Sequence, residues 1–386
     1  MVLDFLRKTQ AAVPERKASA SAKIVAWGGA GRVAWSPRDT VSLTRNGFQG
    51  NPVGFRAVKL IAEAAAALPV LCQDPARRYE AHPVLSLLNR PNPAQGRADL
   101  LEAVFAQLML SGNAYVEAVP GEAGLAELHV LRSDRMSLVP GADGWPAGYD
   151  YVVGAKRHRY PADIICHIKT FHPQDDHYGL APLQAAATAL DVHNAAARWS
   201  KALLDNAARP SGAIVYRGVD GGGAMSEEQF ERLQTELETH HQGARNAGRP
   251  MLLEGGLDWK PMGFSPSDME FQKTKEAAAR DIALAFGVPP MLLGIPGDAT
   301  YANYAEANRA FYRLTVLPLA QKVLAQVAGW LSGLTGDVVD LAPDLDQVPA
   351  LAAEREAQWR RVAEADFLTE GEKRRMLGLP ERPEGA

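Results

Sequence analysis

Apolar side chains recur at spacings of three and four residues between positions 51 and 68, which is the period of an α-helix. Pro69 follows this pattern and ends the helix. A second, short helix is predicted in HPVLSLLNRPNP, where two prolines stop it. The apolar face of the first helix comprises Val53, Ala57, Leu60, Ile61, Ala64 and Leu68.

A third helix is predicted over RADLLEAVFAQLMLSG, and Gly112 is its expected stop. Asp99 is the predicted N-cap, with Glu102 three residues further on in a pattern like a capping box. From 113 to 169 the period changes to two, in short runs separated by Gly, Pro and Asp. These runs predict an antiparallel β region flanked by helices: NAYVEAV, LAELHVL, RMSLVP, YDYVV and DIICHIK.

The helical pattern returns at 181–208, in an alanine-rich segment with few large apolar side chains. Small side chains let helices approach closely, so this segment suits a crowded packing of many helices. Pro210 ends it. A small α/β insert at 209–266 follows, with strands in SGAIVYRG and MLLEGGLDWKPM and a helix in EEQFERLQTELETHH. The second of these strand segments is expected to pair with itself by turning at Gly255 and Gly256.

The next helix is bounded by 267–288, and it runs into the loop segment GVPPMLLGIPGDATYAN. Gly287 and Pro289 predict the end of the helix, because glycine accepts a left-handed cap and proline disfavours helix in the residue before it. MLL at 291–293 is apolar enough to pack as an anchor. The chain after residue 304 is predicted to be helical for almost thirty residues, with a kink at Pro318.

The C-terminal part predicts two more helices, the second starting at Thr369 with Glu372 as its capping partner. Helices and antiparallel strands in separate runs indicate the α+β class. The small, polar and charged residues between 9 and 23 predict a flexible arm at 1–40.

Composition narrows the function. The chain has 386 residues, of which 47% are apolar and 22% charged, and its formal net charge is −4. Proteins that grip duplex DNA tightly usually carry a basic excess, so tight non-specific DNA binding is not expected. Cys72 and Cys166 are too few for a cysteine zinc site and predict buried fillers in a reducing, cytoplasmic setting. No signal peptide and no segment spanning a bilayer are expected.

One cluster could carry metal chemistry, in HIKTFHPQDDH. It holds His167, His172, Asp175, Asp176 and His177, but no pair has the spacing of H-E-x-x-H on a helix. A polar surface loop is therefore the favoured interpretation. A metal-dependent hydrolase using His167, His172, Asp175 and His177 remains the alternative. A sequence-specific DNA-binding protein is disfavoured, since EGEKRRM is the one predominantly basic helix.

Several pieces in fixed order resemble the portal proteins of tailed phages, in the compact form of lambdoid siphophages and gene transfer agents. The pieces that carry the resemblance run from 51 to 381: GNAYVE, DIICHIKTF with YGLAPLQAA, NAARPSGAIV, GGLDWKPM, the segment DMEFQKTKEAAARDIALAFGVPPMLLG and FLTEGEKRRMLGLPE. Three positions depart from the family pattern. Ala181 stands where Ser is commoner, Lys273 where an acid is common, and Lys275 near the usual Arg.

The resemblance implies a portal fold and a non-enzymatic ring of about twelve copies at one capsid vertex, without cofactor, metal or membrane. Double-stranded DNA would pass through it without sequence specificity. The implied protein partners are the terminase large subunit, a head–tail adaptor protein and the major capsid protein. The implied location is the host cytoplasm during assembly and then the vertex of a virion or gene transfer agent particle.

The resemblance also assigns parts to the chain. A β/helical wing occupies 41–180, stem helices 181–208 and 267–288, a clip 209–266, and a tunnel loop region 289–303. A kinked tunnel helix with its return to the wing occupies 304–345, and a short helical crown 346–386. About twelve chains at −4 each give a ring near −48, which repels phosphate so that DNA slides.

The candidate site residues follow from these parts. The tunnel loop would contact DNA through Gly297, Asp298, Ala299, Thr300, Tyr301, Ala302 and Asn303. Channel or intersubunit charges on the stem are Lys273, Lys275 and Arg280, for which ion pairs with Asp191, Asp205 or Glu276 are the competing role. The clip would dock partners through Glu227, Glu228, Glu231, Glu236 and Glu238.

Overall fold

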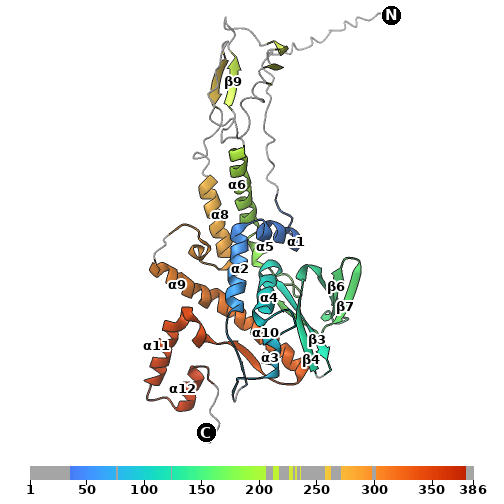
Figure 1. Cartoon of the computed structure of the whole chain (residues 1–386), viewed down its shortest axis with the longest axis vertical. Helices are drawn as coiled ribbons and strands as arrows, with labels where there is room; N and C mark the ends of the chain where they lie inside the picture. The colour runs from blue at the N-terminus through green and yellow to red at the C-terminus, as the bar shows by residue number, and fades with distance from the viewer. Residues whose placement is uncertain are drawn as a thin grey trace, which may run out of the picture. The chain divides into compact units, whose positions relative to one another are not determined.

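The computed structural model describes residues 35–74, 77–122, 124–205, 212–216, 226–228, 231–232, 235, 257–261, 271–297 and 301–379. The chain forms two compact units. One comprises 35–199 with 270–386, and the other comprises 1–34 with 200–269. Figure 1 shows the elements of both in chain order, and each unit is described by itself below.

The larger unit is built around three packed helices, α2 (Pro52–Ala66), α4 (Arg97–Ser111) and α10 (Leu317–Thr335). The Asn51 side chain caps α2 by accepting hydrogen bonds from the backbone N–H of Val53 and Gly54, each at 3.0 Å. The other helices of this unit are α1 (Thr40–Leu43), α3 (Pro83–Asn89), α5 (Pro182–Ala185), α6 (Ala187–Asp205, which continues past 199), α8 (Phe271–Phe286), α9 (Tyr301–Phe311), α11 (Ala352–Ala363) and α12 (Glu370–Met376).

The buried face of α2 differs from the predicted one. Ala57 and Ile61 are buried as expected, but Val53, Leu60 and Ala64 are only half-buried. The core side instead carries small residues: Gly54, Val58, Ala62, Ala65 and Ala66. Close approach explains this shift, because a Cβ on Gly54 would lie 2.1 Å from the Gly47 carbonyl oxygen.

The start of α4 also differs from the prediction. Its N-cap is Gly96, and Asp99 lies one turn inside the helix, where its carboxylate accepts the Gly96 N–H at 3.0 Å. Glu102 instead accepts from the Lys59 ammonium at 2.5 Å. The predicted stop is confirmed, since Gly112 is left-handed with φ of 74°.

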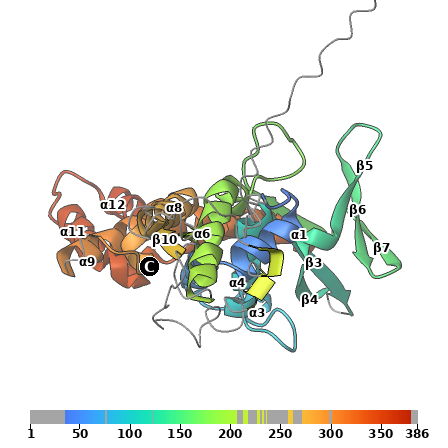
Figure 2. The same cartoon turned by 90° about the horizontal axis from the view of Figure 1, so that it is seen from above.

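The predicted β region forms two three-stranded antiparallel sheets. One has the order β4–β3–β8, from β3 (Asn113–Gly121), β4 (Gly124–Leu131) and β8 (Ile165–Lys169). The other has the order β5–β6–β7, from β5 (Met136–Pro140), β6 (Pro146–Val153) and β7 (Lys156–Pro161). In Figure 2 this second sheet lies on the opposite side of the larger unit from α9, α11 and α12.

Four strands escaped the sequence reasoning. β7 is an exposed edge strand that begins Lys-Arg-His-Arg, so it lacks apolar alternation. A further sheet, β11–β1–β2, pairs β1 (Val70–Gln73) with β2 (Arg78–Tyr79) and with the distant β11 (Asp340–Pro343). These strands have two to four residues, too few to show a period.

The long helix after residue 300 is interrupted just before Pro318. Residues Tyr312–Val316 form a π-helical turn, and α10 begins directly after it. Pro318 lacks the N–H that an uninterrupted helix would use, which fits an irregular turn just before it, and the kink expected at this proline stays a prediction. Two 3₁₀ turns, Leu345–Gln347 and Pro349–Leu351, lead from β11 to α11.

The helix Asn303–Thr335 is long and apolar enough to cross a membrane by length and composition. Its apolar side packs inside this unit, where Val323, Leu324 and Leu331 are at most 1% exposed. The α10 face buries against α2 and β8, as in the core helix of a globular unit.

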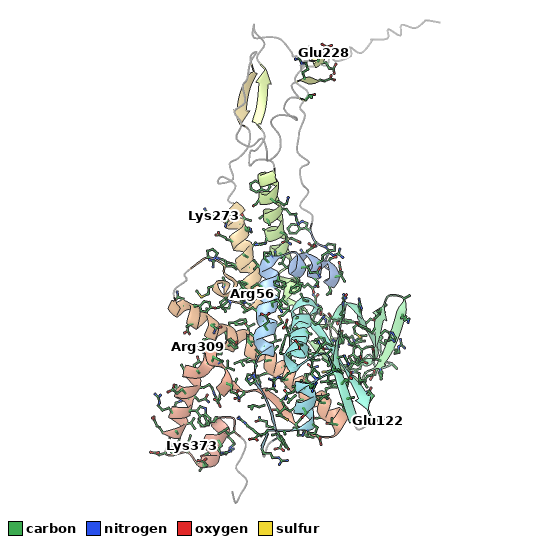
Figure 3. The ribbon with its side chains drawn as sticks, viewed as in Figure 1. Arg56, Glu122, Glu228, Lys273, Arg309 and Lys373 are labelled. Atoms are coloured by element: carbon green, nitrogen blue, oxygen red, sulfur yellow. The ribbon has the colours of Figure 1, made fainter. Side chains whose placement is uncertain are left out.

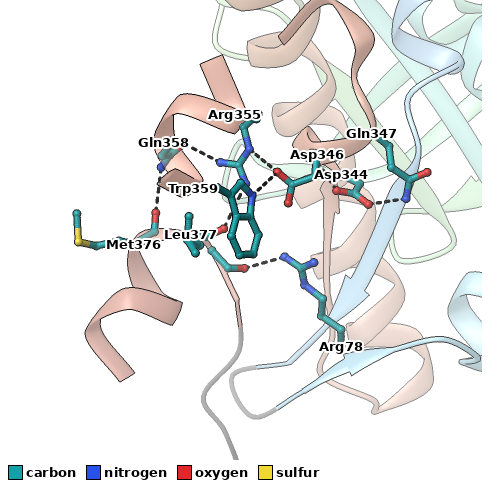
Figure 4. Close-up of polar contacts among 10 residues, drawn as sticks. Arg78, Asp344, Asp346, Gln347, Arg355, Gln358, Trp359, Met376 and Leu377 are labelled. Carbon is teal, nitrogen blue, oxygen red and sulfur yellow. Dashed lines mark hydrogen bonds and ion pairs between the residues drawn. The ribbon is translucent and has the colours of Figure 1, made fainter. Parts of the chain in front are cut away.

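The C-terminal helices are fastened by polar contacts (Figure 4). The Asp346 carboxylate accepts from the Arg355 guanidinium at 2.6 Å and from the Trp359 indole N–H at 3.0 Å. Arg78, on β2, donates to the Gly378 carbonyl at 2.9 Å. The predicted capping box at Thr369 and Glu372 is present.

In the smaller unit, β9 (Gly212–Tyr216) pairs antiparallel with β10 (Leu257–Pro261), from Gly212 opposite Pro261 to Tyr216 opposite Leu257. The partner of β10 is thus the predicted strand after Pro210. The predicted turn at Gly255 and Gly256 and the strand expected before it lie outside the described residues, so the pairing of this segment with itself stays a prediction.

Candidate nucleic-acid interface

The connection from α8 to α9 begins at Gly287, where α8 ends. Gly287 is left-handed, with φ of 66°, as predicted for a helix stop. The Thr315 hydroxyl, in the π-helical turn, donates to the Gly287 carbonyl at 2.6 Å. A Cβ on Gly287 would lie 2.9 Å from the Thr315 hydroxyl oxygen. The end of α8 is therefore tied to the break between α9 and α10.

The first half of the connection is anchored in the unit. A 3₁₀ turn, Pro290–Leu293, places Leu292 and Leu293 half-buried against the core, which agrees with the predicted anchor. Ile295 is 8% exposed and packs on Ala279 and Ala283 of α8. Arg280, also on α8, donates from its guanidinium to the Pro296 carbonyl. Backbone and side chain together fix the path of the chain up to Gly297.

The predicted tunnel loop is shorter than expected. Gly297 is exposed at its start, while Asp298, Ala299 and Thr300 lie outside the described residues. Tyr301, Ala302 and Asn303 belong to the first turn of α9 and not to a loop. Alanines recur through this helix and favour helical backbone, which the sequence reasoning underweighted.

The three candidate charges on α8 fall on two faces. Lys273 and Arg280 are exposed and seven residues apart, so they share one side of the helix (Figure 3 labels Lys273). Lys275 is half-buried and close to His193 of α6. Burial lowers the pKa of His193, and the charge of Lys275 lowers it further. Lys275 therefore faces the protein interior and is a poor candidate for contact with DNA.

Two of the three acids weighed as ion-pair partners make contacts within the unit. Asp191 is 4% exposed and accepts from the Ser36 hydroxyl at 2.5 Å, with the Arg38 guanidinium at 3.8 Å. Glu276 accepts from Gln272 at 2.7 Å, one helical turn away. The side chain of Asp205 lies outside the description. Asp191 and Glu276 thus serve contacts within the unit.

The proposed clip acids are described in part. Glu227, Glu228 and Glu231 are exposed and helical, and Figure 3 labels Glu228. Glu236 and Glu238 lie outside the described residues.

The candidate metal cluster has structural roles. His167 stacks on Tyr115 at 4.3 Å, and its Nε2 donates to the Asn113 amide oxygen at 3.0 Å. Burial, with smaller effects from Lys169 and His177, lowers its pKa to about 4. The Asp175 carboxylate accepts the backbone N–H of His177 at 2.8 Å, and the His172 ring accepts from Gln174. Among the described residues, no three His, Cys, Asp or Glu side chains are placed to hold a metal ion.

Three distant sequence pieces meet at His167. Asn113, next to the left-handed Gly112, also accepts the Gly179 N–H at 2.8 Å. Thr170 donates from its backbone N–H to the Gly112 carbonyl at 2.9 Å. GNAY, HIKT and YGL are therefore one packed node, in which β3, β8 and the entry to α5 are joined.

Both cysteines are buried free thiols, as predicted. Burial raises the pKa of Cys166 to about 12. Two contacts that hold the connection between α8 and α9 were not predicted from the sequence: Thr315 with Gly287, and Arg280 with Pro296. Neither has a local signature, because each joins residues sixteen or more positions apart.

Solved structures share this fold. A chain from the neck of an empty GTA particle, computed with C6 symmetry, is 72% identical with a TM-score of 0.72. The similarity covers 92% of this chain and 97% of that one. A chain from the virion of a native gene transfer agent (GTA) particle is 70% identical with a TM-score of 0.69, at the same coverage. An HK97 family phage portal protein from Corynebacterium diphtheriae, 14% identical with a TM-score of 0.56, shows the fold alone.

Sequence relatives point the same way. A protein of Rickettsia bellii is 37% identical over 92% of this chain and 93% of its own length. The portal protein of Enterobacteria phage HK97 is 25% identical over 86% of this chain and 79% of its own. The sequence profile of the phage portal protein family matches residues 52–378. The chain belongs to the phage portal protein family, and both the expected family and the α+β portal fold are confirmed.

Proposed function

We propose that this chain forms a ring of about twelve copies at one vertex of a capsid, where DNA enters during packaging and leaves through the tail. The observation that carries the proposal is the 72% identity, over nearly the whole of both chains, to a chain in the neck of a GTA particle. That identity also favours a gene transfer agent over a phage. A related neck computed with C12 symmetry supports twelve copies.

The parts of the ring follow the order of the chain. Residues 41–180 serve as the wing, 181–208 and 267–288 as the stem, and 209–266 as the clip that docks the terminase large subunit and later the adaptor. Residues 304–345 form the tunnel helix with its return to the wing, and 346–386 form the crown. The major capsid protein surrounds the ring. Assembly begins in the host cytoplasm, and the function needs no catalytic residue.

The connection between α8 and α9 is the part that contacts passing DNA. Its anchors at Gly287 and Pro296 fix the path of the chain that leads into residues 297–303, which are small or polar. Such a segment touches a duplex without gripping it, because few charges are available for phosphate contacts. Lys273 and Arg280 share the exposed face of α8, and these two stem charges would guide the DNA backbone.

Two measurements test this function. Mass measurement of the purified full chain should give a species of about twelve subunits, and a strict monomer at every concentration and with capsid proteins present would count against the ring. Metal analysis of the purified protein tests the alternative function, a metal-dependent hydrolase. Stoichiometric bound zinc or manganese would support that alternative.

Replacing Asp298, Thr300 and Tyr301 together with Ala should leave ring assembly intact and alter packaging or DNA retention in particles. The reason is that these residues follow the anchored segment in the sequence and take part in neither anchor contact. Unchanged packaging and retention would remove the contact role of this loop. A matched triple replacement on the crown, Glu356, Asp366 and Glu370 to Ala, should leave packaging unaffected.

A further inference from the structure

A groove lies between α6 and α8 in the larger unit. Its volume is about 370 Å³, and its lining includes Thr188, Ala189 and Val192 on one side with Thr274, Ala277 and Asp281 on the other. The lining side chains are mostly small, so a bulky side chain from outside could enter between the helices. Asp281 is exposed and is the acidic residue of the lining.

The groove faces away from α2. On α8, Ala279 and Ala283 pack toward Val53 of α2, whereas Ala277 and Asp281 line the groove. With 3.6 residues per turn, these two pairs lie on well-separated sides of the helix. The same holds on α6, where Leu190 lies against Gly54 of α2, whereas Thr188 and Val192, on the other side of the helix, line the groove. α2 therefore covers one side of the α6–α8 pair, and the groove opens on the other.

The outer face of α2 carries a feature that fits such a groove. Phe55 is 46% exposed, and its ring lies 5.1 Å from that of Phe48. Next to it, the Arg56 guanidinium is half-exposed and reaches Glu63 at 3.5 Å, a distance typical of a weak surface pair (Figure 3 labels Arg56). Phe55 follows Val53 by two residues, so its ring lies on the side of α2 away from α8, and the Arg56 cation is exposed beside it.

The two surfaces lie at the same level of the helix layer. Val53, two residues before Phe55, packs on Ala279 and Ala283, and Asp281 lies between those two alanines in sequence. A cyclic ring needs one surface that fits a different surface on the next copy, and rotation about the axis leaves each residue at its own height. An aromatic–cation knob on one side and a small-residue groove with an acid on the other meet that requirement.

We propose that Phe55 of one copy inserts into the α6–α8 groove of the next copy, with Arg56 opposite Asp281. The inference rests on the proposed ring and names the contact between its copies. Phe55 loses its exposed area on assembly, and the ion pair sets which face docks, since a like charge at this place opposes docking.

Charge exchange tests the pair. Arg56→Glu and Asp281→Arg should each raise the protein concentration needed for half-assembly about tenfold or more, and the double variant should recover most of the loss. Asp366→Arg, an exposed change on the crown, is the control and should assemble like the wild type. Thermal unfolding of each dissociated variant shows whether the fold is kept.

A crosslink tests the position. In a chain with Phe55→Cys and Thr188→Cys, oxidation of the assembled protein should give a ladder of covalent multimers, and either single variant should not. The buried native thiols, with raised pKa, leave this reaction to the new cysteines.

The outcomes separate the two levels of the argument. If both charge variants form rings normally and the double-cysteine chain gives no ladder, the Phe55 contact is overturned. The proposed ring function would then still stand. A wild-type chain that never assembles would overturn both.

Discussion

The buried His167 side chain makes the stability of the fold depend on pH. Its pKa falls from 6.5 to about 4, because burial disfavours the charged ring, and the charges of Lys169 and His177 add smaller effects in the same direction. The folded chain therefore resists a proton that the unfolded chain takes up near pH 6.5. Stability from this group is complete above pH 6.5 and is lost as the pH falls through about 4.

As the pH falls from 6.5 to about 4, we expect the titration of His167 to lower the free energy of unfolding by at most about 3 kcal/mol. Denaturant unfolding measured at several pH values checks it. His167→Gln should flatten the pH dependence, even if it lowers stability throughout, whereas His172→Gln, a change outside the node, should keep the wild-type slope. An unchanged slope in His167→Gln would show that another group titrates.

Gly179 gives a second prediction at the residue scale. A Cβ there would lie 2.1 Å from the Gly112 carbonyl oxygen, which is backbone and cannot rotate away. Gly179→Ala should lower the unfolding free energy by roughly 2 to 4 kcal/mol. Gly329→Ala is the matched control, since a Cβ there meets nothing within 4 Å and should stabilise the α10 helix by about 1 kcal/mol. Thermal melts of the two variants should shift in opposite directions.

At the scale of elements, the contact between Thr315 and Gly287 couples two breaks in the chain. Thr315→Val should speed amide hydrogen exchange at 288–295 about tenfold, because the end of α8 loses the hydrogen bond that fixes it. Thr335→Val on the same helical rod removes a hydroxyl bonded to the local Leu331 carbonyl and should leave that exchange unchanged. Equal protection in both variants would mean that packing alone fixes the connection.

Elements with a clear period were predictable, and those held by distant contacts were not. α2, α4 and β3 form where the apolar spacing and the glycine or proline stops predicted an element, although the buried face of α2 is a different one. β11 could not be predicted, because a four-residue strand owes its existence to pairing with β1 far away in sequence. Asp99 was misplaced for a related reason, since a carboxylate at the third helical position satisfies the same end as a capping residue.

In the candidate site, too, some features could be predicted from the sequence and others could not. Gly287 as a stop and the MLL anchor could be predicted from residue chemistry, but the start of α9 at Tyr301 could not, because small polar residues suit both a loop and a first helical turn. The separation of Lys275 from Lys273 and Arg280 needed the orientation of α8 about its axis, which packing on α2 decides.

At the scale of the whole molecule, charge governs behaviour toward DNA. Each chain carries −4, so the assembled protein should bind duplex DNA weakly at about 150 mM salt, with a shallow dependence of affinity on salt. Titration of labelled duplex at several salt concentrations checks this. A variant with Thr300→Lys should bind more tightly, with a steeper salt dependence, and package more slowly. Tight binding by the wild type, lost steeply with salt, would contradict a sliding channel.

The pairing of β9 with β10 has a consequence for how such chains diversify. Tyr216 lies opposite Leu257, so the intervening sequence leaves and re-enters the protein at neighbouring points. A segment with adjacent ends can be lengthened, shortened or exchanged while the strands that carry it keep their register. Related particles could in this way acquire different packaging machinery by replacing one cassette, and a chimaera spliced at these two residues would inherit the partner preference of its donor.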